Sequence, residues 1–417
     1  MTAPGAPSGG WRCTSCGRRY DLDSPRYTCD CPEEGRLELP PDRAVLGGRP
    51  PAEVLAAGPG SLWRYAPLLP IPAGSPGARR LRSAFPAGGT ALHRADRLAR
   101  RLGLGELWIK NEAANPTGSL KDRASSLVAA AAVNFGRRVV ATASSGNAAV
   151  SMAGAAAAAE LDCVVFVPAA VSQGSLAQLA AYGARVLVVD GDYEAAVQLS
   201  FAACAEWGWY CRTSAVNPYT TQGKKTAALE IAEQLGWRAP DAVVLPAGDG
   251  NILVALHHGF RDALAAGWID RMPRLIAVQA AGAPALHRAW AAGADRVTPV
   301  PASSAAGGIA VADPLDGARA LTALRESGGA VVLVADAELG PAAQALAREA
   351  GLLAEPTSAA AAAALPGLRS AGLLGPEDHV VLINTGGGRG AVAAPPNAAP
   401  IAAKLAAVRA AVPGLTG

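Results

Sequence analysis

The sequence lacks the features that would assign it to a membrane, to nucleic acid or to export. No apolar run reaches the ~18 residues that a membrane-spanning helix needs. A net charge of +3 is too small to predict a nucleic-acid or membrane-surface partner. The first residues, Met1 to Gly10, have neither the charged nor the apolar region of a signal peptide. We therefore expect a soluble, cytoplasmic protein.

Aromatic residues are also scarce, at 5% of the chain, whereas alanine and glycine are abundant. We therefore expect a core packed from small aliphatic side chains with close contacts between helices. A length of 417 residues is too great for one small domain and predicts two or three.

One stretch stands out chemically, from Lys110 to Arg123, with the sequence K-N-E-A-A-N-P-T-G-S-L-K-D-R. Asn115–Gly118 predict a turn, and the composition through Ala132 predicts a helix that begins near Lys121. The positive end of a helix dipole lowers the pKa of an amine placed there. That environment suits a lysine that forms a Schiff base, although a single lysine at a helix end is more often a solvated charge.

Short valine-rich runs alternate with alanine-rich helical segments through the rest of the chain. This alternation predicts right-handed βαβ units and a doubly wound parallel sheet. The runs expected to form buried strands are Val139–Ala143, Cys163–Val167, Val186–Val189, Ala242–Pro246, Leu275–Gln279 and Val380–Asn384.

Three of these strands end in polar, glycine-containing loops, where ligands of open α/β sheets gather. They are Ser144-Ser145-Gly146-Asn147, then Gly248-Asp249-Gly250-Asn251 after Pro246 and Ala247, and Asn384-Thr385 followed by Gly386–Gly388. Backbone N–H groups at such helix starts bind anions. The first loop could equally be a helix cap. The second could be a dinucleotide loop, but it lies late in the chain and lacks the acidic residue that this motif places ~20 positions on.

The segment N-P-T-G-S-x-K-D-R and these loops resemble the threonine synthases, within the fold-type II family of pyridoxal-phosphate (PLP) enzymes, the tryptophan synthase β superfamily. The resemblance implies that Lys121 is the catalytic lysine that binds PLP. It places Asn147 at the 3'-oxygen of PLP, Thr385 at the pyridine nitrogen, and the phosphate on Gly248, Asp249, Gly250 and Asn251. It also implies that Ser144, Ser145 and Asn217 face an amino-acid substrate.

The same resemblance implies an α/β fold with two doubly wound parallel-sheet domains and an N-terminal cysteine-rich module. We predict this module at residues 1–45, a large PLP-binding domain at 46–123 plus 211–417, and a small mobile domain at 124–210. Members of the family are commonly homodimers, which we expect here.

Four of the seven cysteines lie close together near the N-terminus, at Cys13, Cys16, Cys29 and Cys31. Paired cysteines around a polar loop in a cytosolic chain predict a Cys₄ zinc site of the zinc-ribbon type. The C-x-C half is tighter than the usual C-x-x-C, so a degenerate site without zinc stays open. Arginines within this segment could indicate a nucleic-acid-binding ribbon, but such charges are more often a solvated face.

Threonine synthases remove phosphate from O-phosphohomoserine, and several residues that would bind this phosphate differ here. Thr220 stands where many relatives have an arginine, Ser175 replaces a lysine, and Asp249 replaces an amide. Arginine is the best phosphate clamp, and a carboxylate would repel phosphate. Lys224 and Lys225 are either compensating cations or solvated helix charges. From these changes we predict a leaving group other than phosphate.

The predicted function is therefore PLP-dependent elimination or replacement at the β or γ carbon of an amino acid, of the threonine synthase type. Three alternatives stay open. The loop Gly307–Pro314 resembles the serine/threonine dehydratases, which are ammonia-lyases. The cysteine module also occurs in cysteate synthases, which carry out β-replacement. A non-catalytic zinc-ribbon binding protein would lack reactivity at Lys121.

Overall fold

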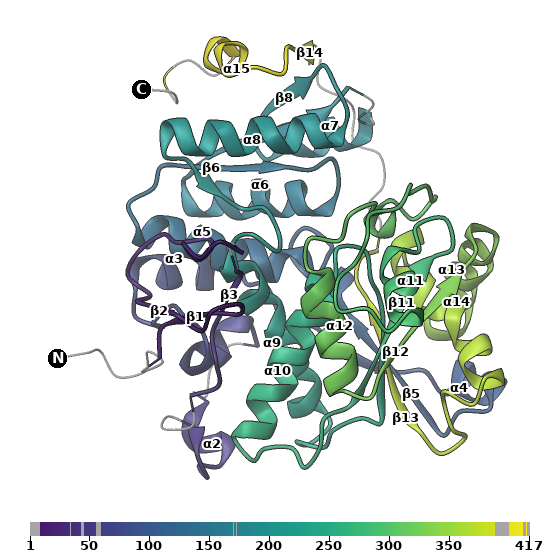
Figure 1. The fold of residues 1–417 in the computed structure, drawn as a ribbon. Coiled ribbons are helices and arrows are strands. Elements are labelled where there is room, and N and C mark those ends of the chain that lie inside the picture. The colour runs from purple at the N-terminus through teal and green to yellow at the C-terminus, as the bar shows by residue number, and fades with distance from the viewer. Residues whose placement is uncertain are drawn as a thin grey trace.

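The computed structural model describes residues 9–33, 35–42, 46–55, 60–169, 171, 173–387, 400–411 and 414, and it contains three sheets (Figure 1). The largest has the order β12-β11-β10-β13-β5-β4 and is parallel except for β4, which pairs antiparallel with β5. Its strands are β4 (Leu92–Arg94), β5 (Glu106–Asn111), β10 (Ala242–Pro246), β11 (Arg274–Ala280), β12 (Ala330–Val334) and β13 (His379–Asn384).

The second sheet has the order β14-β8-β7-β6-β9, and all of its strands are parallel. Its strands are β6 (Val139–Ala143), β7 (Asp162–Pro168), β8 (Arg185–Val189), β9 (Tyr210–Cys211) and β14 (Pro400–Ile401). The third sheet is antiparallel and consists of β1 (Trp11–Cys13), β2 (Arg19–Tyr20) and β3 (Leu37–Glu38) in the order β2-β1-β3.

Helices connect the parallel strands and cover the sheets (Figure 1). In chain order they are α2 (Pro51–Val54), η1 (Leu62–Leu68), α3 (Pro76–Ala84), α4 (Asp96–Leu102), η2 (Glu112–Ala114), α5 (Lys121–Asn134), α6 (Asn147–Ala159), α7 (Gln173–Ala181), α8 (Tyr193–Trp207), α9 (Pro218–Gln234), α10 (Asn251–Ala265), α11 (Ala285–Ala291), η3 (Gly307–Ile309), α12 (Gly317–Glu326), α13 (Asp336–Ala350), α14 (Pro356–Ser370) and α15 (Leu405–Ala411).

The central strands are apolar throughout because both faces of each sheet are buried. All five residues of β10 are buried. Val243 and Leu245 belong to one hydrophobic core, whereas Ala242 and Val244 belong to the core on the opposite face. This alternation is the expected result of a strand with helices on both sides. The prediction of a doubly wound α/β fold is confirmed.

The domain boundaries predicted from the sequence stay a prediction, but the sheets show where each strand belongs. The five-stranded sheet takes β6, β7 and β8 from the predicted small domain. It also takes Cys211 of β9 and the whole of β14, which the prediction placed in the large domain. Residues 1–8 of the predicted N-terminal module and Gly388 of the last glycine loop lie outside the described residues.

The cysteine-bearing sheet packs against helices that lead to the predicted site. The ring of Trp11 meets that of Tyr219, near the start of α9, edge to face with 5.1 Å between centroids. Glu38 lies 3.4 Å from the guanidinium of Arg261 and 3.6 Å from His258, both on α10. Among the described residues, no helix is both long enough and apolar enough to cross a membrane.

Candidate active site

The turn that precedes Lys121 is built by its own residues. Gly118 has φ +92°, which favours glycine, and its N–H donates to the carbonyl of Asn115 at 2.9 Å. The carboxylate of Asp122 accepts from the N–H of Thr117 at 2.6 Å and so fixes the start of α5. Lys121 is therefore the first residue of α5, as the sequence predicted.

The environment of Lys121 lowers the pKa of its amine. Burial lowers the pKa of Lys121 to about 8, and the charge of Arg212 acts in the same direction. The carboxylates of Asp249 and Glu355 oppose this shift in part. A lysine with a pKa near 8 has a substantial neutral fraction under ordinary conditions, which a nucleophile or a base requires.

A buried network of charges holds α5 in place two residues beyond Lys121. The guanidinium of Arg123 is fully buried and contacts the carboxylate of Glu112 at 2.7 Å and that of Glu230 at 2.6 Å. The ammonium of Lys110 contacts Glu230 at 2.7 Å. The bidentate contacts of Arg123 tie α5 to η2, directly after β5, and to α9. They fix the position of Lys121 relative to the large sheet.

The end of β13 runs beside the lysine turn. The N–H of Leu120 donates to the carbonyl of Thr385 at 2.9 Å, and Ser119 forms a bridge with Gly386. The hydroxyls of Thr385 and Ser358 lie 2.8 Å apart, and Ser358 accepts from the N–H of Gly386 at 2.7 Å. If Ser358 donates to Thr385, the proton of Thr385 is left to donate to an acceptor in the site.

Asn147 reaches this same region from the other sheet. Its side-chain amide donates to Glu355 at 2.7 Å, and the N–H of Glu355 donates to the carbonyl of Gly386 at 3.0 Å. Within the described part of the chain, no side chain caps the start of α6, where Asn147 is the first residue. Ser144 and Ser145, just before it, are partly buried. The alternative of an ordinary Ser/Asn cap therefore has no support in the geometry.

The second glycine loop precedes α10, whose start likewise has no side-chain cap from any described residue. Gly250 has φ +86°, and a Cβ on Gly248 would lie 2.7 Å from the carbonyl oxygen of Gly308. Both positions therefore require glycine. The first N–H groups of a helix have no acceptor within it, so this start presents donors to an anion.

Asp249, within this loop, turns its carboxylate towards the backbone. Its Oδ1 accepts from the N–H of Leu315 at 2.8 Å. Burial, and then the charge of Asp316, raise the pKa of Asp249 to about 6. The next residue, Asn251, donates to Thr221 at 2.8 Å and to Asp316 at 2.6 Å.

Two further cations lie at this site, of which Arg212 was not predicted and Lys224 was predicted only as one of two alternatives. Arg212 follows β9 directly, and its N–H donates to the carbonyl of Ala141 at 2.9 Å, beside the end of β6. Lys224 lies on α9 and is buried, so it is not a solvated helix charge. In the sequence, the only sign that Arg212 belongs to a site is that a polar residue follows an apolar strand. This sign is weak because no glycine loop accompanies it.

Asn217 has a different environment from the other predicted residues. It is fully buried, its amide donates to the carbonyl of Cys211 at 2.7 Å, and its oxygen accepts from the N–H of Tyr219 at 3.0 Å. These contacts cap α9 and use both ends of the side chain. The structure therefore gives Asn217 a role in positioning the turn, and its predicted contact with substrate stays untested.

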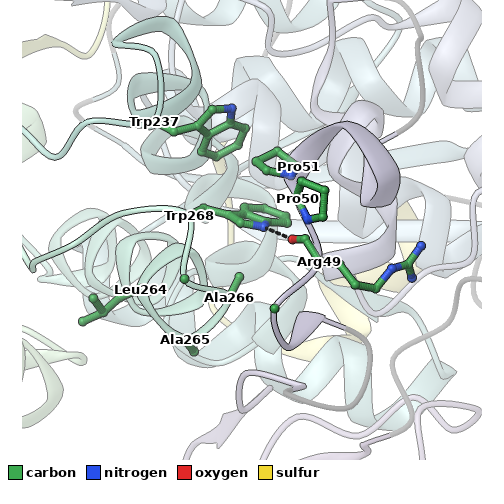
Figure 2. Close-up of a pocket in the computed structure, with 10 residues that line it drawn as sticks. Arg49, Pro50, Pro51, Trp237, Leu264, Ala265, Ala266 and Trp268 are labelled. Atoms are coloured by element: carbon green, nitrogen blue, oxygen red, sulfur yellow. Dashed lines mark hydrogen bonds between the residues drawn. The ribbon is translucent and has the colours of Figure 1, made fainter.

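A pocket lies away from this site and contains none of the predicted site residues. It has a volume of about 630 Å³, and Figure 2 shows Trp237 and Trp268 beside Pro50 and Pro51. Its floor includes the end of α10, whereas the glycine loop lies at the start of this helix. A helix of this length separates the two by roughly 20 Å. The pocket offers Arg49 as its one charged lining residue.

The four N-terminal cysteines form a separate cluster. Their sulfur atoms all lie within 4.8 Å of one another, with Cys13 and Cys31 3.8 Å apart and Cys16 and Cys29 3.5 Å apart. Tetrahedral zinc with Zn–S bonds of about 2.3 Å requires sulfur atoms about 3.8 Å apart. The cluster therefore fits one zinc ion.

Comparison with known proteins identifies the family. Residues 84–386 match the pyridoxal-phosphate dependent enzymes. The chain is 36% identical over 378 residues to a threonine synthase of Methanosarcina acetivorans, covering 90% of each chain. It is likewise 36% identical over 379 residues to a threonine synthase of Methanocaldococcus jannaschii, covering 90% of this chain and 92% of that protein.

Solved structures agree on the fold. A maize serine racemase superposes with a TM-score of 0.65 at 20% identity, covering 75% of this chain and 92% of that one. The chain belongs to the pyridoxal-phosphate dependent enzymes of fold type II. Within that family it is threonine synthase-like, and the dehydratase alternative is not favoured because the curated relatives are threonine synthases.

The residues of the site fit PLP part by part. The uncapped start of α10 suits the phosphate, and the hydroxyl of Thr385 suits a neutral pyridine nitrogen. The side-chain amide of Asn147, which donates to Glu355, suits the ring oxygen of PLP as a hydrogen-bond donor. Lys121 would supply the amine. Glu355 was not among the predicted site residues, yet it joins Asn147 to the end of β13.

Proposed function

We propose that this chain is a threonine synthase in its chemistry, removing a leaving group from the γ carbon of an activated homoserine and adding water at the β carbon. The main support for this proposal is the position of Lys121 and the pKa of its amine. Lys121, with a pKa of about 8, lies where the loops before α6 and α10 meet the end of β13. The identity of 36% over 90% of the chain to threonine synthases supports the reaction type.

Each residue of the site has a role in the proposal. PLP, when bound, supplies the electron sink for carbanion chemistry. Lys121 holds the cofactor before substrate arrives and then, as a free amine, moves the proton of the α carbon. The N–H groups of Gly248, Asp249, Gly250 and Asn251 would bind the cofactor phosphate. Asn147 and Thr385 would orient the ring.

The remaining residues would act on the substrate. The partly buried hydroxyls of Ser144 and Ser145 precede an uncapped helix start, which suits the α-carboxylate of an amino acid. In the overall reaction the Cγ–O bond breaks and its electron pair leaves with the oxygen. Cα loses and later regains its proton, Cβ loses one proton, and Cγ gains one. Water then adds as hydroxide at Cβ and its other proton goes to the leaving group, so one water is consumed and no electron is gained or lost.

The direct test gives the PLP-loaded enzyme O-phospho-L-homoserine and measures phosphate, threonine and 2-ketobutyrate together. Equal amounts of threonine and phosphate are the expected result. Release of 2-ketobutyrate without threonine would identify a lyase instead. The same assay with O-acetyl-L-homoserine examines a substrate with an uncharged leaving group, and no product from either ester would contradict the proposal.

We also propose that Cys13, Cys16, Cys29 and Cys31 bind one structural zinc ion. Four convergent thiols with the spacing of a tetrahedral site support it. We expect about one zinc per chain by elemental analysis, and replacing Cys16 with serine should remove it, since three thiolates bind zinc less well than four. Replacing Cys163 with serine is the matched control and should leave the zinc content unchanged.

We also propose that the enzyme is cytoplasmic and forms a homodimer. Zinc-bound thiolates persist in a reducing compartment, which supports a cytoplasmic location. The resemblance to enzymes that are commonly homodimers supports a dimer. Light scattering on the purified enzyme would measure its mass, and a monomer at working concentration would contradict that part of the proposal.

A further inference from the structure

We infer that Arg212 and Lys224, joined through Ser214, form a second anion site that binds the phosphate leaving group of the substrate. The inference rests on the proposed function and names the residues that select the leaving group. It replaces the prediction from sequence that the leaving group is not phosphate, which relied on the loss of cations at positions 175 and 220.

Within the part of the chain that the structure describes, some of the buried cations near the site have a carboxylate in contact and others do not. Five lysine and arginine side chains among the described residues are almost fully buried, namely Lys110, Arg123, Arg212, Lys224 and Lys225. Three of them have carboxylate partners: Lys110 and Arg123 share Glu230, and Lys225 contacts Asp262 at 2.7 Å. Arg212 and Lys224 form no ion pair within the described part of the chain. The carboxylates of Asp249 and Asp316 act on Lys224 without an ion-pair contact among the described residues. Burying a cation without a direct partner is costly, so an anionic ligand in contact is the natural partner.

Arg212 has an unused donor, and both cations approach the same hydroxyl group. The Nη2 atom of Arg212 is buried and has no hydrogen-bond partner among the described residues. Its Nη1 donates to the hydroxyl of Ser214 at 2.8 Å, and the ammonium of Lys224 lies 3.4 Å from the same hydroxyl. Both cations therefore converge on Ser214, which is itself partly exposed. A dianion placed there would receive a guanidinium fork and an ammonium.

Both cations lie near the start of α5, where Lys121 is located. A Cβ on Gly223 would lie 2.1 Å from the carbonyl of Arg123, so α9 crosses α5 closely just before Lys224. This crossing brings Lys224 to the start of α5, and the charge of Lys121 contributes to the lowered pKa of Lys224, after burial. Arg212 comes from the other sheet, at the strand next to the loop of Ser144. The site therefore lies between the two sheets and beside the reactive lysine.

The cofactor phosphate has its own binding group, the uncapped start of α10. Lys224 touches only the side chain of Asn251 there. Arg212, directly after β9, forms no side-chain hydrogen bond with this loop among the described residues, and its Nη1 donates to Ser214 instead. A phosphate at this second site would have its negative charge stabilised as the Cγ–O bond breaks.

The test uses the PLP-loaded enzyme and two variants, Arg212→Met and Lys224→Met. With O-phospho-L-homoserine each should lower kcat/KM by about 10- to 100-fold, the usual effect of removing a hydrogen bond to a charged group. Inorganic phosphate should raise the melting temperature of the native holoenzyme and inhibit it competitively. Both effects should be lost in the two variants, whereas Lys224→Arg should retain them.

The matched control replaces the neighbouring buried ion pair by apolar groups, in the double variant Lys225→Met with Asp262→Leu. It should keep the response to phosphate and the kcat/KM. Weaker binding of PLP to Arg212→Met or Lys224→Met, seen by titration of absorbance, would assign the cations to the cofactor and overturn the inference. Stabilisation by phosphate that survives in both variants would also overturn it. Threonine made from O-acetyl-L-homoserine alone would overturn the inference yet keep the proposed function.

Discussion

Replacing Lys121 with alanine is expected to lower turnover by at least about 10³-fold, because the residue both holds the cofactor and moves the substrate proton. The chain has five lysines, at positions 110, 121, 224, 225 and 404, which makes the attachment site easy to identify. Reduction of the PLP-loaded enzyme with borohydride, followed by digestion and mass spectrometry, should find the pyridoxyl group on Lys121. The variant should give no such peptide.

Lys404 provides the control, since it is exposed and far along the chain from the site. Lys404→Ala should keep both turnover and the modified Lys121 peptide. The amines of Lys121 and Lys224 both lie close to Arg212, so Lys224 is the alternative attachment site. Labelling of Lys224 in place of Lys121 would contradict the assignment. A folded Lys121→Ala protein with normal turnover would do so as well.

The lowered pKa of Lys121 also predicts a dependence on pH. Only the neutral amine attacks the cofactor aldehyde, and the neutral fraction grows as the pH rises through about 8. The rate at which the apoenzyme takes up PLP should therefore rise between pH 6 and 8 and level off above. An ordinary, solvated lysine would still be gaining reactivity at pH 10.

Much of the fold could be predicted because buried parallel strands are apolar along their whole length. Val139–Ala143 and Ala242–Pro246 form strands with the predicted bounds. β9 was missed because it has two residues, too few to form a pattern. β12 was missed because this edge strand is only partly buried, and its Leu333 is exposed. An edge strand contributes less apolar surface to the core, so its sequence is less constrained.

The candidate site could be predicted where a loop follows a strand and carries glycine. Its cations could not, because their environment depends on segments that are distant in sequence. Lys224 lies one helical turn after Thr220 on α9, so a cation on nearly the same face of the helix remains although position 220 has lost its arginine. Neighbouring lysines 224 and 225 look alike in sequence, yet Lys225 forms an ion pair with Asp262 on α10, whereas Lys224 forms none with the residues that the structure describes. Only the packing of α9 against α10 separates them.

The network beneath Lys121 should make Glu230 one of the most sensitive positions for stability. Glu230→Gln leaves the charges of Lys110 and Arg123 with Glu112 as their remaining carboxylate in the network, so one buried cation is uncompensated. Removing one partner of a buried pair costs about 3–5 kcal/mol. We expect a loss of this size in the free energy of unfolding, measured by urea denaturation. The control Asp295→Asn removes an exposed partner of Arg325 and should have almost no effect.

The effect of pH separates this electrostatic explanation from a loss of packing. Burial alone would raise the pKa of Glu230, but Arg123 and then Lys110 lower it to about 2. A carboxylate whose pKa is lower in the folded state stabilises the protein above its unfolded pKa and ceases to do so as the pH falls. The difference in stability between the native enzyme and Glu230→Gln should therefore shrink as the pH falls from about 4.5 towards 2. A difference that stays constant over this range would mean that shape, and not charge, makes Glu230 necessary. The tie between α5 and α9 would then be steric, and the double variant Lys110→Met with Glu230→Met would be as unstable as Glu230→Gln.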